Sequence, residues 1–377
     1  MVESKYRETK VEIDCQAIKK NLLVEIRHTG DATQVFVVVK ADAYGHGARE
    51  IARVCSKNGA NGFCVATLDE GIELRESGIQ EPILVLAPIS QRFIEVAARH
   101  RLSITLASFE WWKKAKAESF TGKVSVHVKI DTGMGRIGFR KTAEALQCIS
   151  EIEAHPHFEW EGLFTHFASA DSPTDDYYKM QSERFKEVLA FIPRKPKYIH
   201  VSNTASSYWH GEHQGNMVRF GIGLYGLNPS GGDLSVGMRQ WAALSLKSQL
   251  IHSKLIEAGS SIGYGSTYTA GKQEWIGTVP IGYADGWLRH LQGSHVLVDG
   301  HRCEIVGRIC MDQLMIRLPH HYSEGEKVTL IGEDKGEVIS IQEIADYLET
   351  IHYEVACTIS PRIPRVYVGL NEALNQS

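Results

Sequence analysis

The sequence predicts an α/β protein with an N-terminal (β/α)8 barrel of the TIM type followed by a mostly antiparallel β domain. Its 377 residues exceed what one compact core usually holds, which favours two domains. Before residue 235, apolar β-branched runs alternate with amphipathic stretches. After it, short β-rich segments are punctuated by glycine. We therefore expect a barrel domain at 12–235 and a β domain at 236–377 that also includes residues 1–11.

The predicted barrel strands are near-continuous apolar runs, as is typical of parallel strands that are buried on both faces. Eight runs cover residues 33–40, 62–67, 82–88, 102–108, 123–131, 158–167, 197–204 and 216–226. Amphipathic patterns predict helices at 15–30, 48–59, 141–155 and 175–192. Eight such units match a closed barrel, although an open, doubly wound sheet of eight strands also satisfies the pattern.

The predicted β domain follows from four segments in which short apolar runs meet glycine-containing turns. They lie at 245–259, 274–286, 294–310 and 327–334. Runs of this length that are separated by turn residues are typical of antiparallel sheets.

The composition excludes several classes of protein. A formal net charge of −4 gives no reason to expect a nucleic-acid partner, and no apolar run is long enough to span a membrane. The N-terminal segment lacks the apolar stretch of a secretory signal, and the seven cysteines are scattered, so we expect a cytoplasmic protein. His210 and His213 have H-x-x-H spacing without further ligands nearby, and we expect no metal.

The strongest chemical signal is a lysine at the end of the first predicted barrel strand. Lys40 stands in the segment VVVKADAYGHG at 37–47. Barrel enzymes build their active sites at the carboxyl ends of the strands, although a single lysine there more often reaches solvent. The segment resembles, position for position, the attachment site for pyridoxal 5'-phosphate (PLP) in the alanine racemase family.

The resemblance extends in order along nearly the whole chain. Further segments that resemble the family are 131–138, 164–167, 219–226, 263–265, 282–286, 308–312 and 361–365. Each is weak by itself, but the ordered set is very specific.

Two of these segments contain the pattern G-x-G-x-x-G, which by itself suggests a dinucleotide site. The first, at 133–138, would need an acidic residue at the end of the next strand, but that strand ends in Thr165-His166-Phe167. The second, at 221–226, follows the eighth strand, where barrels commonly bind phosphate through backbone N–H groups.

The resemblance implies a role for each matching residue at the cofactor. Lys40 would bind PLP covalently through its amine, and phosphate would be bound by Tyr44, Thr204, the amides of Gly221 and Ile222, and Tyr353. Asn203 is included among the cofactor-binding residues. Position 204 is threonine where serine is usual in the family, and a hydroxyl is retained.

Arg219 is the most informative residue of the set. The resemblance places it at the pyridine nitrogen of PLP, with His166 beside the ring and hydrogen-bonded towards the arginine. Because a guanidinium is a donor only, that nitrogen would stay unprotonated and the ring would withdraw electrons weakly. Without the resemblance, an ion pair at the end of the barrel would be a competing interpretation of Arg219.

Racemisation needs one base on each face of the substrate carbon. The resemblance implies Lys40 as one base and Tyr264, supplied by the partner subunit of a homodimer, as the other. Met311 and Asp312 would belong to the same partner-derived wall, and Arg136 would contact the substrate carboxylate. Lys129 matches a lysine that is carbamylated in some members. Tyr283 and Tyr353 match residues at the substrate entrance.

The expected function is the PLP-dependent interconversion of L- and D-alanine, which supplies D-alanine for bacterial cell-wall peptidoglycan. A racemase for serine, or one of broader specificity, is the hardest alternative to exclude, because the sequence does not give pocket volume. A PLP decarboxylase of similar barrel fold would place a carboxylate where Arg219 stands. A small PLP-binding barrel protein without activity would lack the β domain.

Overall fold

The structure is a computed structural model that describes residues 2–211 and 215–375. The chain divides into two compact units. One, here called the barrel unit, contains residues 16–43, 48–241 and the C-terminal segment from 371. The other, here called the β unit, contains residues up to 15, residues 44–47 and residues 242–370.

The barrel unit is built on eight parallel strands. They are β2 (Gln34–Val38), β3 (Gly62–Val65), β4 (Ile83–Val85), β5 (Ser103–Leu106), β6 (Val124–Lys129), β7 (Phe158–Phe164), β8 (Tyr198–His200) and β9 (Met217–Phe220). Their order is β8-β7-β6-β5-β4-β3-β2-β9, so the last strand pairs with the first, with Val35 opposite Val218. Between β9 and β8, the Arg219 N–H donates to the carbonyl of Ser202 at 3.0 Å. The nearly closed barrel is therefore confirmed, and the open sheet is excluded.

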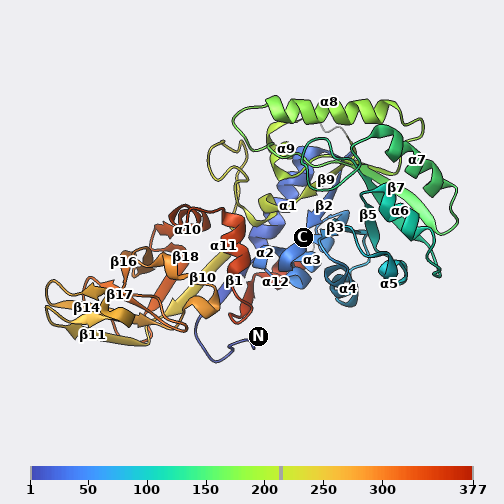
Figure 1. The fold of residues 1–377 in the computed structure, drawn as a ribbon. Coiled ribbons are helices and arrows are strands. Elements are labelled where there is room, and N and C mark those ends of the chain that lie inside the picture. The colour runs from blue at the N-terminus through green and yellow to red at the C-terminus, as the bar shows by residue number, and fades with distance from the viewer. Residues whose placement is uncertain (1, 212–214, 376–377) are drawn as a thin grey trace. The chain divides into compact units, whose positions relative to one another are not determined.

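Helices surround these strands (Figure 1). They are α1 (Cys15–Thr29), α3 (Ala48–Lys57), α4 (Leu68–Glu76), α5 (Ile94–Arg99), α6 (Phe109–Ala115), α7 (Thr142–Glu153), α8 (Asp176–Ala190), α9 (Thr204–Trp209) and the terminal α12 (Leu370–Leu374). The four helices predicted from amphipathic patterns are thus present as α1, α3, α7 and α8. In α3, for example, Ile51, Val54 and Cys55 lie on the buried side, which is the apolar stripe that the pattern predicts.

The β unit contains one large sheet in which the pairs are antiparallel except for β1 with β20. The path is β11-β14-β17-β16-β15-β18-β10-β1-β20, and β19 pairs with β18. The strands are β1 (Lys10–Asp14), β10 (Leu244–Gln249), β11 (His252–Ile256), β14 (Glu274–Val279), β15 (His295–Val298), β16 (His301–Val306), β17 (Leu314–Leu318), β18 (Lys327–Asp334), β19 (Glu337–Ile339) and β20 (Arg365–Val368). The predicted, mostly antiparallel β domain is confirmed.

Shorter elements complete the β unit. They are the hairpin β12 (Ser261–Ile262) and β13 (Tyr268–Thr269), the 3-10 turns η3 (Tyr264–Ser266), η4 (Tyr283–Asp285) and η5 (Arg289–Leu291), and the helices α10 (Ile341–Tyr347) and α11 (His352–Thr358). The corresponding turns of the barrel unit are η1 (Gln91–Phe93) and η2 (Ile222–Tyr225).

A buried ion pair explains why the N-terminal residues belong to the β unit. The carboxylate of Asp285 accepts two hydrogen bonds from the guanidinium of Arg7, at 2.7 and 2.9 Å. It also accepts the Gly282 N–H at 3.0 Å, and the Nε of Arg362 lies 3.7 Å away. Because Asp285 is almost fully buried, loss of Arg7 would leave a carboxylate with one close cation fewer.

Within the described ranges, no helix is long and apolar enough to cross a membrane, and no group of three or more metal-ligand side chains could hold an ion. His213 lies outside the described residues. The ring of His210 stacks on Tyr178 at 3.7 Å, and its Nε2 lies 3.0 Å from the carbonyl of Ala170. The seven cysteines are free thiols.

Glu25 on α1 predicts a pH dependence of stability. Its side chain is fully buried, and it accepts the hydroxyl of Ser207 at 2.5 Å while its Oε2 has no partner. Burial raises the pKa of Glu25 to about 7. The charged form is therefore disfavoured in the folded state, so stability is lost as pH rises from the unfolded-state value through 7, by about 3 kcal/mol.

Replacing Glu25 with glutamine retains the hydrogen bond and removes the charge. We expect Glu25→Gln to raise the melting temperature at pH 8 and to change it little at pH 5. The exposed Glu187→Gln is the control and should be neutral at both values. An equal effect of Glu25→Gln at the two pH values would contradict this assignment.

Candidate active site

The predicted site residues of the barrel unit gather at one end of the barrel. They follow or end five strands: Lys40 after β2, Lys129 and Arg136 at β6, His166 after β7, Asn203 and Thr204 after β8, and Arg219, Gly221 and Ile222 at β9. These are the carboxyl ends of the strands, where barrel active sites are built. The positive groups of Arg219, Lys129, Arg136 and Lys40 are close enough to lower the pKa of His166, after burial as the main cause.

Lys40 begins a helix of unusual hand. In α2 (Lys40–Gly45), the four residues from Ala41 to Tyr44 have φ between 52° and 54°. Non-glycine residues adopt this left-handed conformation at a cost of roughly 1–2 kcal/mol each, so the segment stores about 4–8 kcal/mol of strain. The sequence carried no signal for it, since only Gly45 is a glycine.

Two carboxylates of the barrel unit hold the start of this helix. The Ala41 N–H donates to Glu70 Oε1 at 2.8 Å, and the Ala48 N–H donates to Asp42 Oδ1 at 2.7 Å. Glu70 also accepts the N–H groups of Ala66 and Thr67 as part of the capping box of α4. Glu70 thus ties the residue after Lys40 to α4, and sequence reasoning missed it.

Arg219 is a buried cation, 4% exposed, that is held entirely by neutral groups. Its NH1 donates to Nδ1 and the carbonyl of His200, at 2.6 and 3.0 Å. Its NH2 donates to the carbonyls of Thr165 and Val201, both at 3.0 Å, and lies 3.2 Å from His166 Nδ1. Among residues 2–211 and 215–375, no carboxylate forms an ion pair with Arg219, so the competing ion-pair interpretation is wrong. The same residues offer no acceptor to its Nε–H.

Lys129 is a second buried cationic residue, 2% exposed. Its Nζ has no hydrogen-bond partner among the described residues and lies 4.7 Å from the ring centroid of Phe164. Burial, followed by the charges of Arg219 and Arg136, moves the pKa of Lys129 well below its ordinary value. A lowered pKa raises the share of the neutral amine, whose lone pair is available for reaction.

The second glycine run forms a turn around the hydroxyl of Thr204. Its Oγ1 accepts the N–H groups of Gly221 and Gly223, at 3.1 and 3.4 Å. A Cβ on Gly223 would lie 2.2 Å from the hydroxyl of Tyr208, so the turn closes only with glycine there. Because both lone pairs of the Thr204 oxygen are used, its O–H remains available to donate to an anion. Asn203 caps α9 through its Oδ1, which accepts the Ser206 N–H at 2.9 Å.

The first glycine run has a different function. The amides of Gly133 and Gly135 donate to Oδ1 of Asp131, at 3.1 and 2.9 Å. N–H groups that are used by a neighbouring carboxylate do not form a pyrophosphate site, in agreement with the rejection of the dinucleotide interpretation. The turn presents Arg136 as an exposed side chain beside Lys129.

The β unit holds the other predicted residues in two places. The rings of Tyr44 and Tyr353 lie 6.1 Å apart. Tyr264, Tyr283 and Met311 are exposed by 72%, 40% and 53%. The loop 308–312 contacts the segments that carry these three side chains. The guanidinium of Arg308 packs beside Gly265, and the carbonyl of Met311 accepts the Ala284 N–H at 3.1 Å.

Asp312 in the same loop is fixed by an ion pair within the β unit. Its Oδ1 accepts NH1 of Arg362 at 2.6 Å, and Arg362 in turn lies beside Asp285. The loop that presents Met311 is thereby linked to the buried carboxylate that anchors the N-terminal residues.

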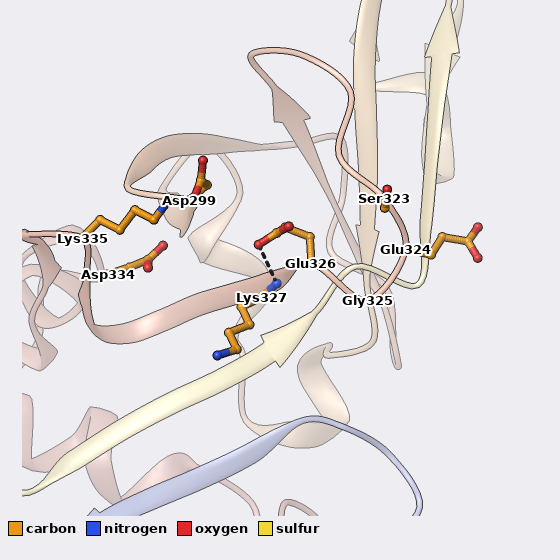
Figure 2. Close-up of a pocket in the computed structure, with 8 residues that line it drawn as sticks. All are labelled: Asp299, Ser323, Glu324, Gly325, Glu326, Lys327, Asp334 and Lys335. Atoms are coloured by element: carbon orange, nitrogen blue, oxygen red, sulfur yellow. Dashed lines mark hydrogen bonds and ion pairs between the residues drawn. The ribbon is translucent and has the colours of Figure 1, made fainter.

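A hollow of about 550 Å³ in the β unit contains none of the predicted residues. Figure 2 shows its lining, in which Lys335 pairs with Asp299 while Asp334 lies nearby. Four acidic side chains and two lysines line it, and none of the predicted catalytic side chains is present.

Comparison with protein families supports the resemblance seen in the sequence. Residues 13–229 match the model described as alanine racemase, N-terminal domain, and residues 243–367 match alanine racemase, C-terminal domain.

Individual proteins give the same result. The chain is 51% identical to the alanine racemase of Levilactobacillus brevis, over 97% of this chain and 100% of that protein. The crystal structure of alanine racemase from E. faecalis has a TM-score of 0.95 and 51% identity, and the match covers 97% of this chain and 100% of that one. A histidine racemase from Leuconostoc mesenteroides subsp. sake has the same fold, with a TM-score of 0.92, 32% identity and coverage of 97% and 99%.

Strain in α2 gives a testable difference between two substitutions of the exposed Ala41. Valine is β-branched and strongly disfavoured at this φ, whereas glycine adopts it freely. We expect Ala41→Val to lower the free energy of unfolding of the apoprotein, measured by urea denaturation, by about 2 kcal/mol or more, and to weaken cofactor retention. Ala41→Gly should stay within about 1 kcal/mol of the parent protein. If the two variants behave alike, the left-handed helix is not strained.

Proposed function

Since the chain belongs to the alanine racemase family of PLP-dependent isomerases, we propose that it interconverts L- and D-alanine by a two-base mechanism with Lys40 and Tyr264 as the bases. A single observation carries this proposal. Arg219 is buried and donates hydrogen bonds through NH1 and NH2, but its Nε–H has no acceptor in the described part of the chain.

The residues at the end of the barrel fit PLP. The pyridine nitrogen of PLP is an acceptor, and the Nε–H of Arg219 is the matching donor. The O–H of Thr204 and the amide of Ile222 suit a phosphate, whereas the amide of Gly221 already donates to Thr204 Oγ1 and orients that hydroxyl. The resemblance adds the phenols of Tyr44 and Tyr353, whose rings lie 6.1 Å apart in the β unit. His166 is held neutral beside the ring position, and Lys40 supplies the amine for covalent attachment.

The bound cofactor withdraws electrons from the substrate Cα and so makes its proton acidic. The protein residues then need only move protons. One base takes the Cα proton from one face and the other returns a proton to the opposite face, so the net charge of the site does not change. An arginine that cannot accept a proton limits the electron withdrawal, which disfavours side reactions such as transamination.

Arg136 and Lys129 would serve the substrate carboxylate. Arg136 is exposed and cationic, so it is able to pair with an anion. Burial moves the pKa of Lys129 well below its ordinary value, which raises the share of the neutral amine that attacks carbon dioxide, and no hydrogen-bond partner of its Nζ is found among the described residues. Carbamylation would turn it into an anion beside Arg136 and hold that guanidinium in place.

We propose a homodimer in which the β unit of one chain completes the site on the barrel of the other. The exposed Tyr264, Tyr283 and Met311 support this, because such apolar side chains are usually covered when they gather on one loop cluster. The division of function would follow the sequence, with 12–235 binding the cofactor and 236–377, with residues 1–11, supplying the second base. Met311 and Asp312 would then face the partner's substrate.

The biological role that follows is the production of D-alanine in the cytoplasm, as a precursor of cell-wall peptidoglycan. Alanine is the substrate that the family favours. The histidine racemase of the same fold shows that this scaffold also accepts a larger side chain, so serine or broader activity is the alternative that a substrate panel decides.

Covalent attachment of the cofactor to Lys40 has a direct test. We expect borohydride reduction of the holoenzyme, followed by peptide mapping, to place the pyridoxyl group on Lys40. Lys40→Ala should show no label there and at least a thousandfold loss of activity, because both attachment and one base are removed. Label on a different lysine of the parent protein would contradict the assignment.

Sharing of the sites is tested by refolding two inactive variants together. Lys40→Ala and Tyr264→Phe, mixed in equal amounts, form about half mixed dimers if chains pair at random. One site of each mixed dimer then carries both substitutions and the other carries neither, so activity should return to about a quarter of the parent value. Refolded parent protein is the control. Efficient refolding without recovery would show that each chain completes its own site.

A further inference from the structure

A chain of buried polar side chains runs through the interior of the barrel away from Arg219. His200 Nδ1 lies 2.6 Å from the NH1 of Arg219, and His200 Nε2 lies 2.8 Å from His127 Nδ1. His127 Nε2 lies 3.2 Å from Glu161 Oε2, which also accepts the hydroxyl of Ser103 at 2.6 Å. Barrel interiors are usually filled by branched apolar side chains, so this continuous polar path needs an explanation.

The two ends of the path determine the direction of every hydrogen bond in it. A guanidinium only donates, so Nδ1 of His200 must accept and the ring proton is on Nε2. That N–H donates to Nδ1 of His127, so the proton of His127 is also on Nε2. A carboxylate only accepts, and Glu161 receives that last N–H. With the proton on Nε2 in both histidines, every hydrogen bond from Arg219 to Glu161 therefore has one donor and one acceptor.

Local features of the backbone build this path. The pairing of β6 with β7 shifts between Val126, opposite Trp160, and His127, opposite Gly162, so Glu161 is the extra residue of a bulge. A Cβ on Gly162 would lie 2.3 Å from the ring of His127, so the imidazole occupies its place only beside glycine. The ring of His200 stacks on Phe164 at 4.5 Å.

We propose that Glu161 is the remote counter-ion of Arg219 and that His127 and His200, as neutral donors in series, position the guanidinium for the cofactor. Only the statement that the guanidinium is positioned for the cofactor rests on the proposed function. Glu161, His127 and His200 act through Arg219, so they are positioning residues and not catalytic ones.

The charges along the path agree with this role. Burial lowers the pKa of His127 and moves that of His200 well below its ordinary range, so both rings are neutral at working pH. Burial alone would raise the pKa of Glu161, but the hydrogen bond from His127, with that from Ser103 and the charge of Lys197, lowers it on balance. A buried cation without a carboxylate is costly, and polarised hydrogen bonds that end on an anion offset part of that cost.

The far end of the path reaches solvent at the opposite end of the barrel strands. Glu161 lines a hollow of about 310 Å³ with Arg75, Arg101 and Ser103, and Lys197 lies 3.7 Å from its Oε1. The negative end is therefore stabilised by water and cations, while the positive end stays dry. This separation keeps carboxylates away from the cofactor and still balances the charge of Arg219.

The apoprotein tests the path without the cofactor. In protein labelled with 15N-histidine, NMR distinguishes protonated from unprotonated ring nitrogens, and spectra of His127→Gln and His200→Gln assign the signals. We expect both rings to carry the proton on Nε2. Glu161→Leu removes the acceptor of the His127 Nε2–H, so the tautomers, which Arg219 fixes from the other end, should persist while the Nε2 and Hε2 resonances of His127 shift as that hydrogen bond is lost. Glu159→Gln removes an exposed carboxylate of the same strand and is the matched control.

The holoenzyme tests the charge. Glu161→Gln retains an oxygen acceptor, so the tautomers should persist while kcat falls about tenfold, the size typical of outer hydrogen-bond partners, with KM unchanged within about twofold. The absorbance of the bound cofactor should change in Glu161→Gln and stay unchanged in Glu159→Gln.

The outcomes separate the inference from the proposed function. Parent-like kcat and absorbance in Glu161→Gln would overturn the role as counter-ion, whether or not Glu161→Leu folds. Resonances of the His127 Nε2–H that are unchanged in Glu161→Leu, or a ring proton on Nδ1 of either histidine in the parent protein, would overturn the path itself. Failure of Lys40 to bind PLP would instead contradict the proposed function, and the NMR result on the apoprotein would stand.

Discussion

The burial of a positive charge without an adjacent carboxylate is the constraint on which the rest of the site depends. Arg219 is 4% exposed and is surrounded by carbonyls and imidazoles. Burial, together with the field of Arg219, moves the pKa values of Lys129 and His166 well below their ordinary values. A site of this kind favours anionic ligands, such as a phosphate or an amino-acid carboxylate. It can also donate a hydrogen bond to a ring nitrogen without transferring a proton to it, because a guanidinium keeps its protons.

A second constraint is the conformation after Lys40. Four consecutive left-handed residues break the ordinary preference of L-amino acids, and such departures concentrate at functional positions. Glu70 and Asp42 hold the start of this segment with hydrogen bonds to backbone amides, so the strain is balanced by contacts within the barrel unit. Lys40 is thereby placed at the end of a rigid strand and not on a free loop.

The two units contribute different kinds of residue. The barrel unit gathers buried, hydrogen-bonded groups, as a cofactor site requires. The β unit instead exposes Tyr264 and Met311 on one cluster of loops, whose backbone is anchored through Asp285 and Arg362. Rigid presentation of exposed side chains suits completion of a site by a second copy of the chain.

The sequence alone determined the strands and most of the candidate site. Apolar periodicity is a local property, so the eight barrel strands could be predicted, and the ordered motifs, through their resemblance to the family, made Lys40, Arg219 and Tyr264 candidates for the site. Only the tertiary structure decided the left-handed helix, the role of Glu70 and the path from Arg219 to Glu161. These depend on strand register: the bulge at Glu161 and the space above Gly162 bring together side chains that lie 34 to 73 residues apart in the chain. No periodic pattern encodes such a contact, because its partners meet only after the barrel closes.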